Sequence, residues 1–201
     1  MEFCALKNEF QRRHSRRWQI FAHGSRQGAF LEIGGQTLLA RQIQLAHELG
    51  AAEIFISGRA ETNYSEFNRR VLQDKFPDAG PLAGIERALD AAKLPLLLVL
   101  AVDLPEMNAE LLRALAANCA ENFGAIPRVK KNLEPLAAFY PKAAQPLAET
   151  MLHNQQYAVS IFAERCVQSN LARFVELSVS DAKYFTNWNS PADLTSMVVK
   201  R

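Results

Sequence analysis

One apolar run constrains the fold of this 201-residue chain more than any other feature of its sequence. The run is LPLLLVLAV, from Leu94 to Val102, and Asp103 follows it directly. Such a near-continuous apolar stretch is typical of a strand that is buried on both faces of a parallel sheet. It is too short to span a bilayer as a helix. We therefore expect it to form a central strand of an α/β protein.

The segments on either side of this run alternate between helical and strand patterns. We expect helices in TLLARQIQLAHELG (with Gly50 at its end), YSEFNRRVL, IERALDAAK, NAELLRALAANCAENFG (capped by Asn108), AAQPLAETMLH and VSIFAERC, and strands in AEIFISG, GAIPRV, LAAFY and FVELSV. Alternating strands and helices predict a mostly parallel sheet with helices on both faces, which is a three-layer α/β fold. No repeat, low-complexity tract or linker interrupts the pattern, so a single domain over residues 1–201 is expected.

The composition argues against several classes of protein. A net charge of +2 creates no overall field that would attract nucleic acid or a membrane surface. Cys4, Cys119 and Cys166 are widely spaced and form no metal-binding pattern, which favours reduced thiols and a cytoplasmic location. The amino terminus lacks the apolar core and cleavage site of a secretory signal. The histidines show no ligand spacing, so none is expected in catalysis.

Asp103 is the strongest candidate for chemistry because of its place in the chain. It follows the buried strand and precedes Leu104 and Pro105, so it is expected at the carboxyl end of that strand. Ligands of open α/β sheets bind at this edge. A carboxylate there can hold Mg²⁺ against phosphate oxygens. An aspartate in this position can equally open a turn or cap the next helix, and position alone does not separate the two roles.

Three polar segments are further binding candidates. The loop GPLAG (Gly80–Gly84) leads into a helix, where backbone N–H groups and the helix start favour a negatively charged ligand. Asp74, upstream of this loop, either accepts a hydrogen bond from a nucleobase or ribose or is simply solvated. In the segments EPLAAFYP and TNWNSPADL, polar turns adjoin strand-like residues. Asn187 and Asn189 either line a pocket or form the turn before a helix that starts near Pro191.

Taken in order, these segments resemble the molybdenum cofactor guanylyltransferase family. The matching stretches are FLEIGGQTLLARQI, DAGPLAGI, VLAVDLPEM, GAIPRV, LEPLAAFYP and FTNWNSPADL, and they cover most of the chain from Phe30 onward. The resemblance implies a three-layer Rossmann-like nucleotidyltransferase fold. It also implies an enzyme that transfers GMP from Mg²⁺-bound GTP to the terminal phosphate of molybdopterin and releases pyrophosphate.

The same resemblance implies roles for individual residues. Asp103 would be the catalytic Mg²⁺ ligand. The nucleotide side would comprise Asp74, Gly80, Pro81, Leu82 and Gly84 with Asp103, and the pterin side Pro135, Leu136, Asn187 and Asn189. The implied partners are GTP and molybdopterin, with molybdoenzymes or their chaperones as further partners. Nucleic acid and membranes are not expected as partners.

Two other functions stay open on the sequence. A cytidylyltransferase or sugar-phosphate nucleotidyltransferase could use the same scaffold, because the choice of base depends on pocket residues. A non-catalytic relative that binds the cofactor or a chaperone could have lost the phosphate loop altogether.

The amino terminus departs from the family pattern. The family opens with a strand and a loop of the form LAGGxSxRMGxDK, whose backbone amides, Arg and Lys hold the triphosphate. Here the stretch RRHSRRWQIFAHGSRQG, from Arg12 to Gly28, stands in its place. If the reading frame is shifted by one nucleotide, the codons from His14 to Gln27 are compatible with ILAGGKSSRMGRDK. Tryptophan has a single codon, TGG, so the shifted codon at Trp18 must encode glycine. Our hypothesis is that the residues up to about Gly28 are a frame-shifted rendering of the family's loop.

Competing interpretations of this stretch are a basic arm for nucleic acid and an organelle transit peptide. Under the frame-shift hypothesis, residues 1–28 are aberrant or disordered in place of the usual strand and phosphate loop, although RWQIFAHG has enough apolar residues to replace the strand in part. Electrostatic stabilisation and positioning supply most of phosphoryl-transfer catalysis. The chain as written is therefore expected to be a poor enzyme.

Overall fold

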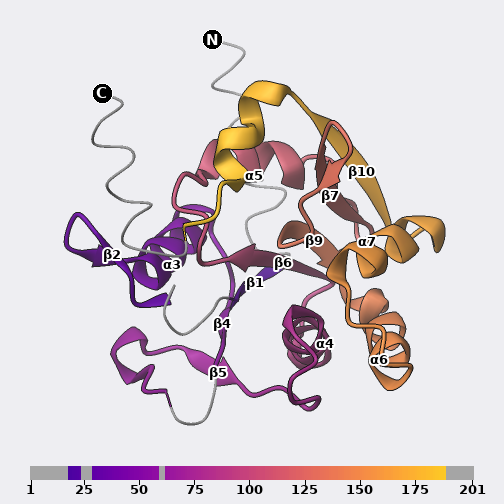
Figure 1. Ribbon diagram of the computed structural model, residues 1–201, viewed down its shortest axis with the longest axis horizontal. Helices are drawn as coiled ribbons and strands as arrows, with labels where there is room; N and C mark the ends of the chain where they lie inside the picture. The colour runs from indigo at the N-terminus through magenta and orange to yellow at the C-terminus, as the bar shows by residue number, and fades with distance from the viewer. Residues whose placement is uncertain (1–17, 24–28, 59–61, 189–201) are drawn as a thin grey trace.

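The computed structural model describes residues 18–23, 29–58 and 62–188. Within these residues, an eight-stranded sheet has the order β10-β7-β9-β6-β1-β4-β5, with β8 paired to β7 (Figure 1). Its strands are β1 (Trp18–His23), β4 (Ile54–Ser57), β5 (Arg70–Leu72), β6 (Leu96–Ala101), β7 (Gly124–Val129), β8 (Asn132–Leu133), β9 (Ala137–Pro141) and β10 (Ala172–Leu177). A separate small hairpin joins β2 (Glu32–Ile33) to β3 (Gln36–Thr37).

The main sheet is mostly parallel, as the sequence predicts. β1 pairs in parallel with β6 and β4, β4 with β5, and β10 with β7. β9 is antiparallel to both β6 and β7, so β6 and β7 run in the same direction. The carboxyl ends of β6, β1, β4, β5 and β7 consequently meet at one edge of the sheet.

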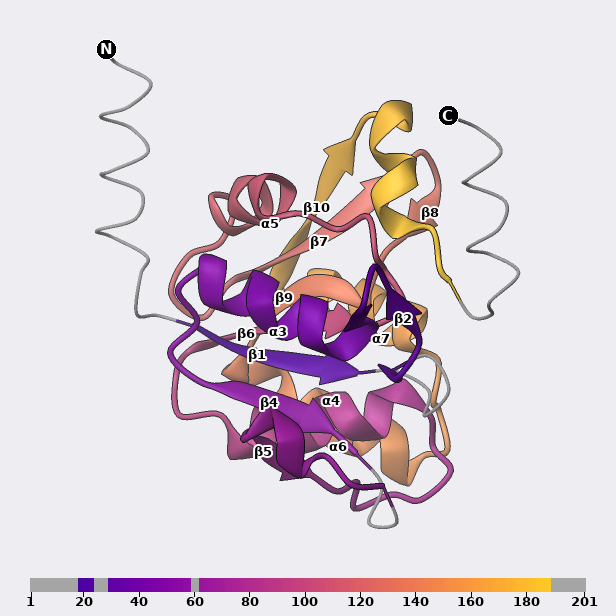
Figure 2. The ribbon, with the colours of Figure 1, turned by 90° about the vertical axis from the view of Figure 1, so that its left-hand side faces the viewer.

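Helices cover both faces of the sheet, which confirms the predicted three layers. Figure 2 shows α3 (Leu38–Glu48) and α5 (Ala109–Ala116) on one side and α4 (Pro81–Ala91) and α6 (Gln145–His153) on the other. The α7 helix (Val159–Gln168) packs with α4 and α6 into the same apolar cluster. No helix in the described part of the chain is long and apolar enough to cross a membrane.

The apolar run from Leu94 to Val102 contains β6, which is buried on both faces. Leu96, Leu98 and Leu100 pack into the cluster under α3 and α5. Leu97 and Val99 pack into the cluster under α4, α6 and α7. This alternation accounts for the lack of polar residues in the run, because neither side of the strand meets water.

Part of the stretch from Arg12 to Gly28 forms an inner strand of the sheet. Trp18–His23 form β1 between β6 and β4, as the apolar content of RWQIFAHG anticipated. Ile20–Ala22 are at most 1% exposed. The buried Gln19 side chain accepts hydrogen bonds at Oε1 from the backbone N–H groups of Lys93 (2.8 Å) and Leu94 (3.1 Å). The remaining residues of the 1–28 stretch lie outside the described residues.

Three predicted helices differ from the structure. The helix expected in NAELLRALAANCAENFG ends at Ala116, and the residues that follow form turns with a bridge between Ala120 and Phe123. The helix expected in YSEFNRRVL is wrong: Ser65–Phe67 form a single 3₁₀ turn, Asn68 has a left-handed backbone (φ 45°), and Arg70–Leu72 form β5. Pairing with β4 decides this conformation, because the backbone groups along the edge of β4 form hydrogen bonds with Arg70–Leu72 as strand β5. The helix expected to begin at Ile85 begins at Pro81, since proline fits the first helical position, where no N–H is needed.

The helix ends that the sequence marks are confirmed. The Asn108 side chain caps α5 by accepting a hydrogen bond from the N–H of Leu111 at 2.9 Å. Gly50 follows α3 with a positive φ of 75°, which glycine adopts without steric penalty. These local signals fix where α3 ends and where α5 begins. The start of α5 in turn sets the length of the connection that follows β6.

Candidate functional site

Asp103 lies in the turn directly after β6, and neighbouring elements hold this turn from two sides. The N–H of Trp188 donates a hydrogen bond to the Asp103 carbonyl at 2.8 Å. The amide Nε2 of Gln42, from α3, donates to the Leu104 carbonyl at 2.8 Å. The backbone around Asp103 is therefore fixed by α3 and by the segment that ends the described chain.

The half-buried carboxyl group of Asp103 has the properties of a cation ligand. Burial raises the pKa of its half-buried carboxyl, and a backbone hydrogen bond partly opposes this rise. No ion pair within residues 18–23, 29–58 and 62–188 reaches it. Those residues also contain no group of three or more His, Cys, Asp or Glu side chains that could hold a metal. A single carboxylate fits Mg²⁺, which commonly takes its other ligands from substrate phosphates and water.

The nucleotide-side residues lie where β5 leads into α4. Asp74 is exposed in the loop after β5. Gly80 is the N-cap of α4 with φ 68°, and nothing lies within 4 Å of where a Cβ would stand. Leu82 and Gly84 are buried in the first turns of the helix, and the Leu82 side chain packs into the core. At the start of α4, a ligand can therefore reach the backbone at Gly80, whereas the Leu82 side chain is out of reach.

The turn between β8 and β9 carries Pro135 and Leu136. The N–H of Ala101 donates to the Leu136 carbonyl at 2.7 Å, which extends the β6–β9 ladder. The hydroxyl of the buried Tyr140 donates to the Pro135 carbonyl at 2.9 Å. The structure thus places both residues at the carboxyl end of β6, close in the sheet to the turn that holds Asp103.

Asn187 also comes to this edge. Its side chain is exposed, and its neighbour Trp188 is buried and bonded to the Asp103 carbonyl. Asn189 and the helix expected near Pro191 lie outside the described residues. The structure therefore gathers all the described site candidates at the carboxyl edge of the sheet, and their chemical roles stay predictions.

Sequence reasoning missed two residues that support Asp103. Gln42 is only 3% exposed, and it lies on the apolar face of α3 beside Leu38 and Ile43. A polar residue at a core-facing helical position was the available signal. Trp188 is 7% exposed, and a tryptophan within the polar stretch TNWNS was the corresponding signal.

Glu134 is a third residue that was missed, although it opens the motif EPLAAFYP. Its carboxyl is half-buried, and no ion pair or side-chain hydrogen bond in the described part of the chain involves it. Burial raises the pKa of Glu134 from 4.5 to about 7. An ionisable group with such a pKa at this edge of the sheet belongs among the site candidates.

We expect Glu134→Gln to stabilise the protein at pH 8 and to leave its stability unchanged near pH 4. Because the folded-state pKa is raised, the folded protein binds the proton more tightly, and ionisation lowers stability as pH rises from 4.5 to about 7. With solvent screening of this half-exposed group, the gain at pH 8 is about 1 kcal/mol. Urea unfolding at both pH values measures it. Glu121→Gln, at an exposed glutamate, is the control, and an equal gain at both pH values would contradict the assignment.

A cavity of about 590 Å³ lies at the opposite edge of the sheet. Its lining includes Leu94 and Pro95, which precede β6, together with Lys142, which follows β9. Acidic and basic side chains both line it, so it offers no net positive field for a triphosphate. We therefore assign the site to the carboxyl edge and not to this cavity.

Solved structures share the fold at low sequence identity. Molybdopterin-guanine dinucleotide biosynthesis protein A from Archaeoglobus fulgidus superposes with a TM-score of 0.67 at 20% identity, over 92% of this chain and 100% of that one. The 2-C-methyl-D-erythritol 4-phosphate cytidylyltransferase from Thermus thermophilus superposes with a TM-score of 0.68 at 17% identity, over 92% of this chain and 100% of the other. These similarities establish a nucleotidyltransferase fold.

Sequence comparison is more specific. A probable molybdenum cofactor guanylyltransferase from Opitutus terrae is 36% identical over 171 residues, which are 84% of this chain and 85% of that protein. The model of the family described as the MobA-like NTP transferase domain matches residues 14–169 of this chain. This match covers β1 to α7 and includes the Asp103 turn. The chain therefore belongs to the MobA-like NTP transferase family.

Proposed function

We propose that this protein transfers GMP from GTP to molybdopterin, forming the guanine dinucleotide cofactor and releasing pyrophosphate. The observation that carries the proposal is the Asp103 carboxylate, which lacks a described counter-charge and is held at the carboxyl end of β6. The name of the Opitutus relative supports guanylyl transfer. The product would pass to molybdoenzymes or their chaperones, and the reaction is proposed for the cytoplasm.

The chemistry needs no side-chain nucleophile. An oxygen of the molybdopterin phosphate forms a bond to the α-phosphorus of GTP, and the bond from that phosphorus to the bridging oxygen of pyrophosphate breaks. Bound Mg²⁺ supplies neutralisation of charge on the phosphate oxygens. Asp103 would hold the ion, while Asp74 and the backbone at the start of α4 would contact the nucleotide. Pro135, Leu136 and Asn187 would border the pterin.

We also infer that the amino terminus is a frame-shifted rendering of the family's phosphate loop. In the shifted frame, the residues after Arg17 would form the loop, but as written Trp18–His23 are the strand β1. The sequence then has only five residues, Gly24 to Gly28, before Ala29, and none of them is a lysine. The family match reaches upstream to residue 14, which supports the loop being in this stretch. Resequencing the gene tests this: a neighbouring frame without such a loop would rule it out.

The alternatives make different predictions. A cytidylyltransferase shares the fold, as the Thermus thermophilus enzyme illustrates, so the fold alone does not select the base. The guanylyltransferase name of the sequence relative favours GTP. A non-catalytic relative would bind the pterin without turnover, and a gene whose frame is intact as written would favour it.

The test is product formation by a chain whose loop has been restored. We expect this chain, given molybdopterin, Mg²⁺ and equal concentrations of GTP and CTP, to release pyrophosphate and to form the guanine dinucleotide in preference to the cytosine dinucleotide. Chromatography of the labelled products measures the ratio. A predominance of the cytosine product, or tight pterin binding without any turnover, would refute the proposed function.

A further inference from the structure

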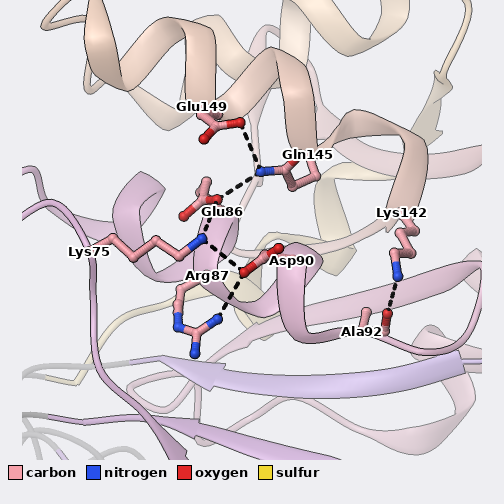
Figure 3. Close-up of polar contacts among 8 residues, drawn as sticks. All are labelled: Lys75, Glu86, Arg87, Asp90, Ala92, Lys142, Gln145 and Glu149. Atoms are coloured by element: carbon pink, nitrogen blue, oxygen red, sulfur yellow. Dashed lines mark hydrogen bonds and ion pairs between the residues drawn. The ribbon is translucent and has the colours of Figure 1, made fainter.

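The loop that carries Asp74 is attached to α4 by a lysine. Lys75 Nζ lies 2.8 Å from Oδ2 of Asp90 and 3.6 Å from Oε1 of Glu86. Glu86 and Asp90 are four residues apart on α4 and therefore share one face of the helix. Figure 3 shows the Lys75 side chain extended beside α4, with its ammonium group between the two carboxylates.

The buried partner makes this contact unusual. Glu86 is fully buried, and its Oε1 also accepts a hydrogen bond from Nε2 of Gln145, on α6, at 2.8 Å. Its Oε2 has no hydrogen-bond partner among the described residues. A buried carboxylate is strongly destabilising unless a cation compensates it. Lys75 is the cation within 4 Å of Glu86 in the described chain, whereas Arg87 pairs with Asp90.

Further contacts hold the loop downstream of Lys75. The ring of Phe76 meets that of His153 edge-on at 5.1 Å, and Ala79 is buried in the core. Most other side chains between β5 and α4 are exposed. Lys75 is therefore an attachment point next to Asp74, and its ion pairs tie this part of the loop to α4.

We propose that Lys75 is a positioning residue for the nucleotide. Its ion pairs with Glu86 and Asp90 hold the neighbouring Asp74 at a fixed position relative to the start of α4. This inference rests on the proposed function and deepens it. It concerns nucleotide binding alone, because the turn at Pro135 and Leu136 contacts neither Lys75 nor its partners in any described hydrogen bond or ion pair.

The test compares variants of the full-length chain with the restored loop. Lys75→Met is expected to raise KM for GTP about tenfold, with kcat and KM for molybdopterin changed less than about threefold. Lys75→Arg, which can also bridge two carboxylates, is expected to keep KM for GTP within about threefold. Arg87→Met is the matched control, because it removes a cation from Asp90 but leaves Lys75 in place, and its KM for GTP should not change.

A double variant separates positioning from stability. Lys75→Met alone leaves Glu86 uncompensated and should lower Tm by roughly 4 to 8 °C. Combining Lys75→Met with Glu86→Gln removes the buried charge, so Tm should recover while KM for GTP stays high. Recovery of both quantities would mean that Lys75 acts only on stability and would overturn the proposal. Calorimetry of GTP binding to the chain with the restored loop provides a second readout without turnover: Lys75→Met should weaken binding about tenfold, and unchanged binding would overturn the proposal.

The two hypotheses fail in different ways. If the chain with the restored loop transfers GMP but Lys75→Met leaves KM for GTP unchanged, the positioning role is wrong and the proposed function stands. If that chain neither binds GTP nor transfers GMP, the proposed function itself is wrong.

Discussion

A chain in which residues 14–27 are replaced by ILAGGKSSRMGRDK is expected to transfer GMP at least about 1,000-fold faster than the chain as written. Each preorganised donor aimed at a phosphoryl group accounts for roughly 100-fold to 1,000-fold in rate. The replacement contains two lysines, two arginines and three glycines, and it puts the lysine of the family's DK pair where Gln27 stands in the chain as written. Steady-state release of pyrophosphate, with molybdopterin and GTP both varied, measures the difference.

A second replacement identifies the source of this gain. A version that carries the same loop but keeps Gln27 lacks only the lysine of the family's DK pair and retains the other lysine. It should recover the fold of the loop and lose most of the rate. Both replaced chains must show the same Tm for the comparison to hold. Equal turnover by the replaced chain and the chain as written would show that the phosphate loop is not needed and would refute the frame-shift hypothesis.

In the chain with the restored loop, Asp103→Ala is expected to lower the rate of GMP transfer at least about 1,000-fold. The change removes the carboxylate assigned to Mg²⁺, so charge on the phosphate oxygens is no longer offset. Asp103→Asn should have a similar effect on rate without lowering Tm. Since burial raises the pKa of Asp103, the ionised carboxylate lowers the stability of the metal-free protein, and a neutral isostere removes that penalty.

The control for this experiment is Glu106→Ala, at an exposed carboxylate three residues further along the same connection. It should change the rate of GMP transfer by less than about twofold. It should change the free energy of unfolding by less than about 0.5 kcal/mol. The rate should be followed over a range of Mg²⁺ concentrations, since the parent should need the ion and Asp103→Ala should respond weakly. Undiminished transfer by Asp103→Ala would place the active site elsewhere.

Strongly periodic segments allowed most of the fold to be predicted from the sequence. The run from Leu94 to Val102 identified β6 because only a strand covered on both faces can lack polar residues throughout. The apolar face of α3 and the Asn108 cap identified their helices for equally local reasons. The sequence of motifs also indicated the family, which the match over residues 14–169 confirms.

The errors arose where local propensity and tertiary pairing disagree. The stretch YSEFNRRVL has enough helical periodicity to suggest a helix, but β4 offers an open ladder, and Arg70–Leu72 pair with it. The beginning of α4 was misplaced because Gly80 and Pro81 mark turns in general. In the structure they cap and open a helix.

The sequence by itself determined the layered α/β class, the central strand and the aspartate that follows it, because these depend on hydrophobic patterning along short segments. Only the tertiary structure decided which distant segments share an edge with that aspartate. Gln42 and Trp188 reach the Asp103 turn from 62 and 85 residues away in sequence. Lys75 finds its buried partner on a different element. Such contacts depend on how helices pack on a sheet, and no local pattern encodes that arrangement.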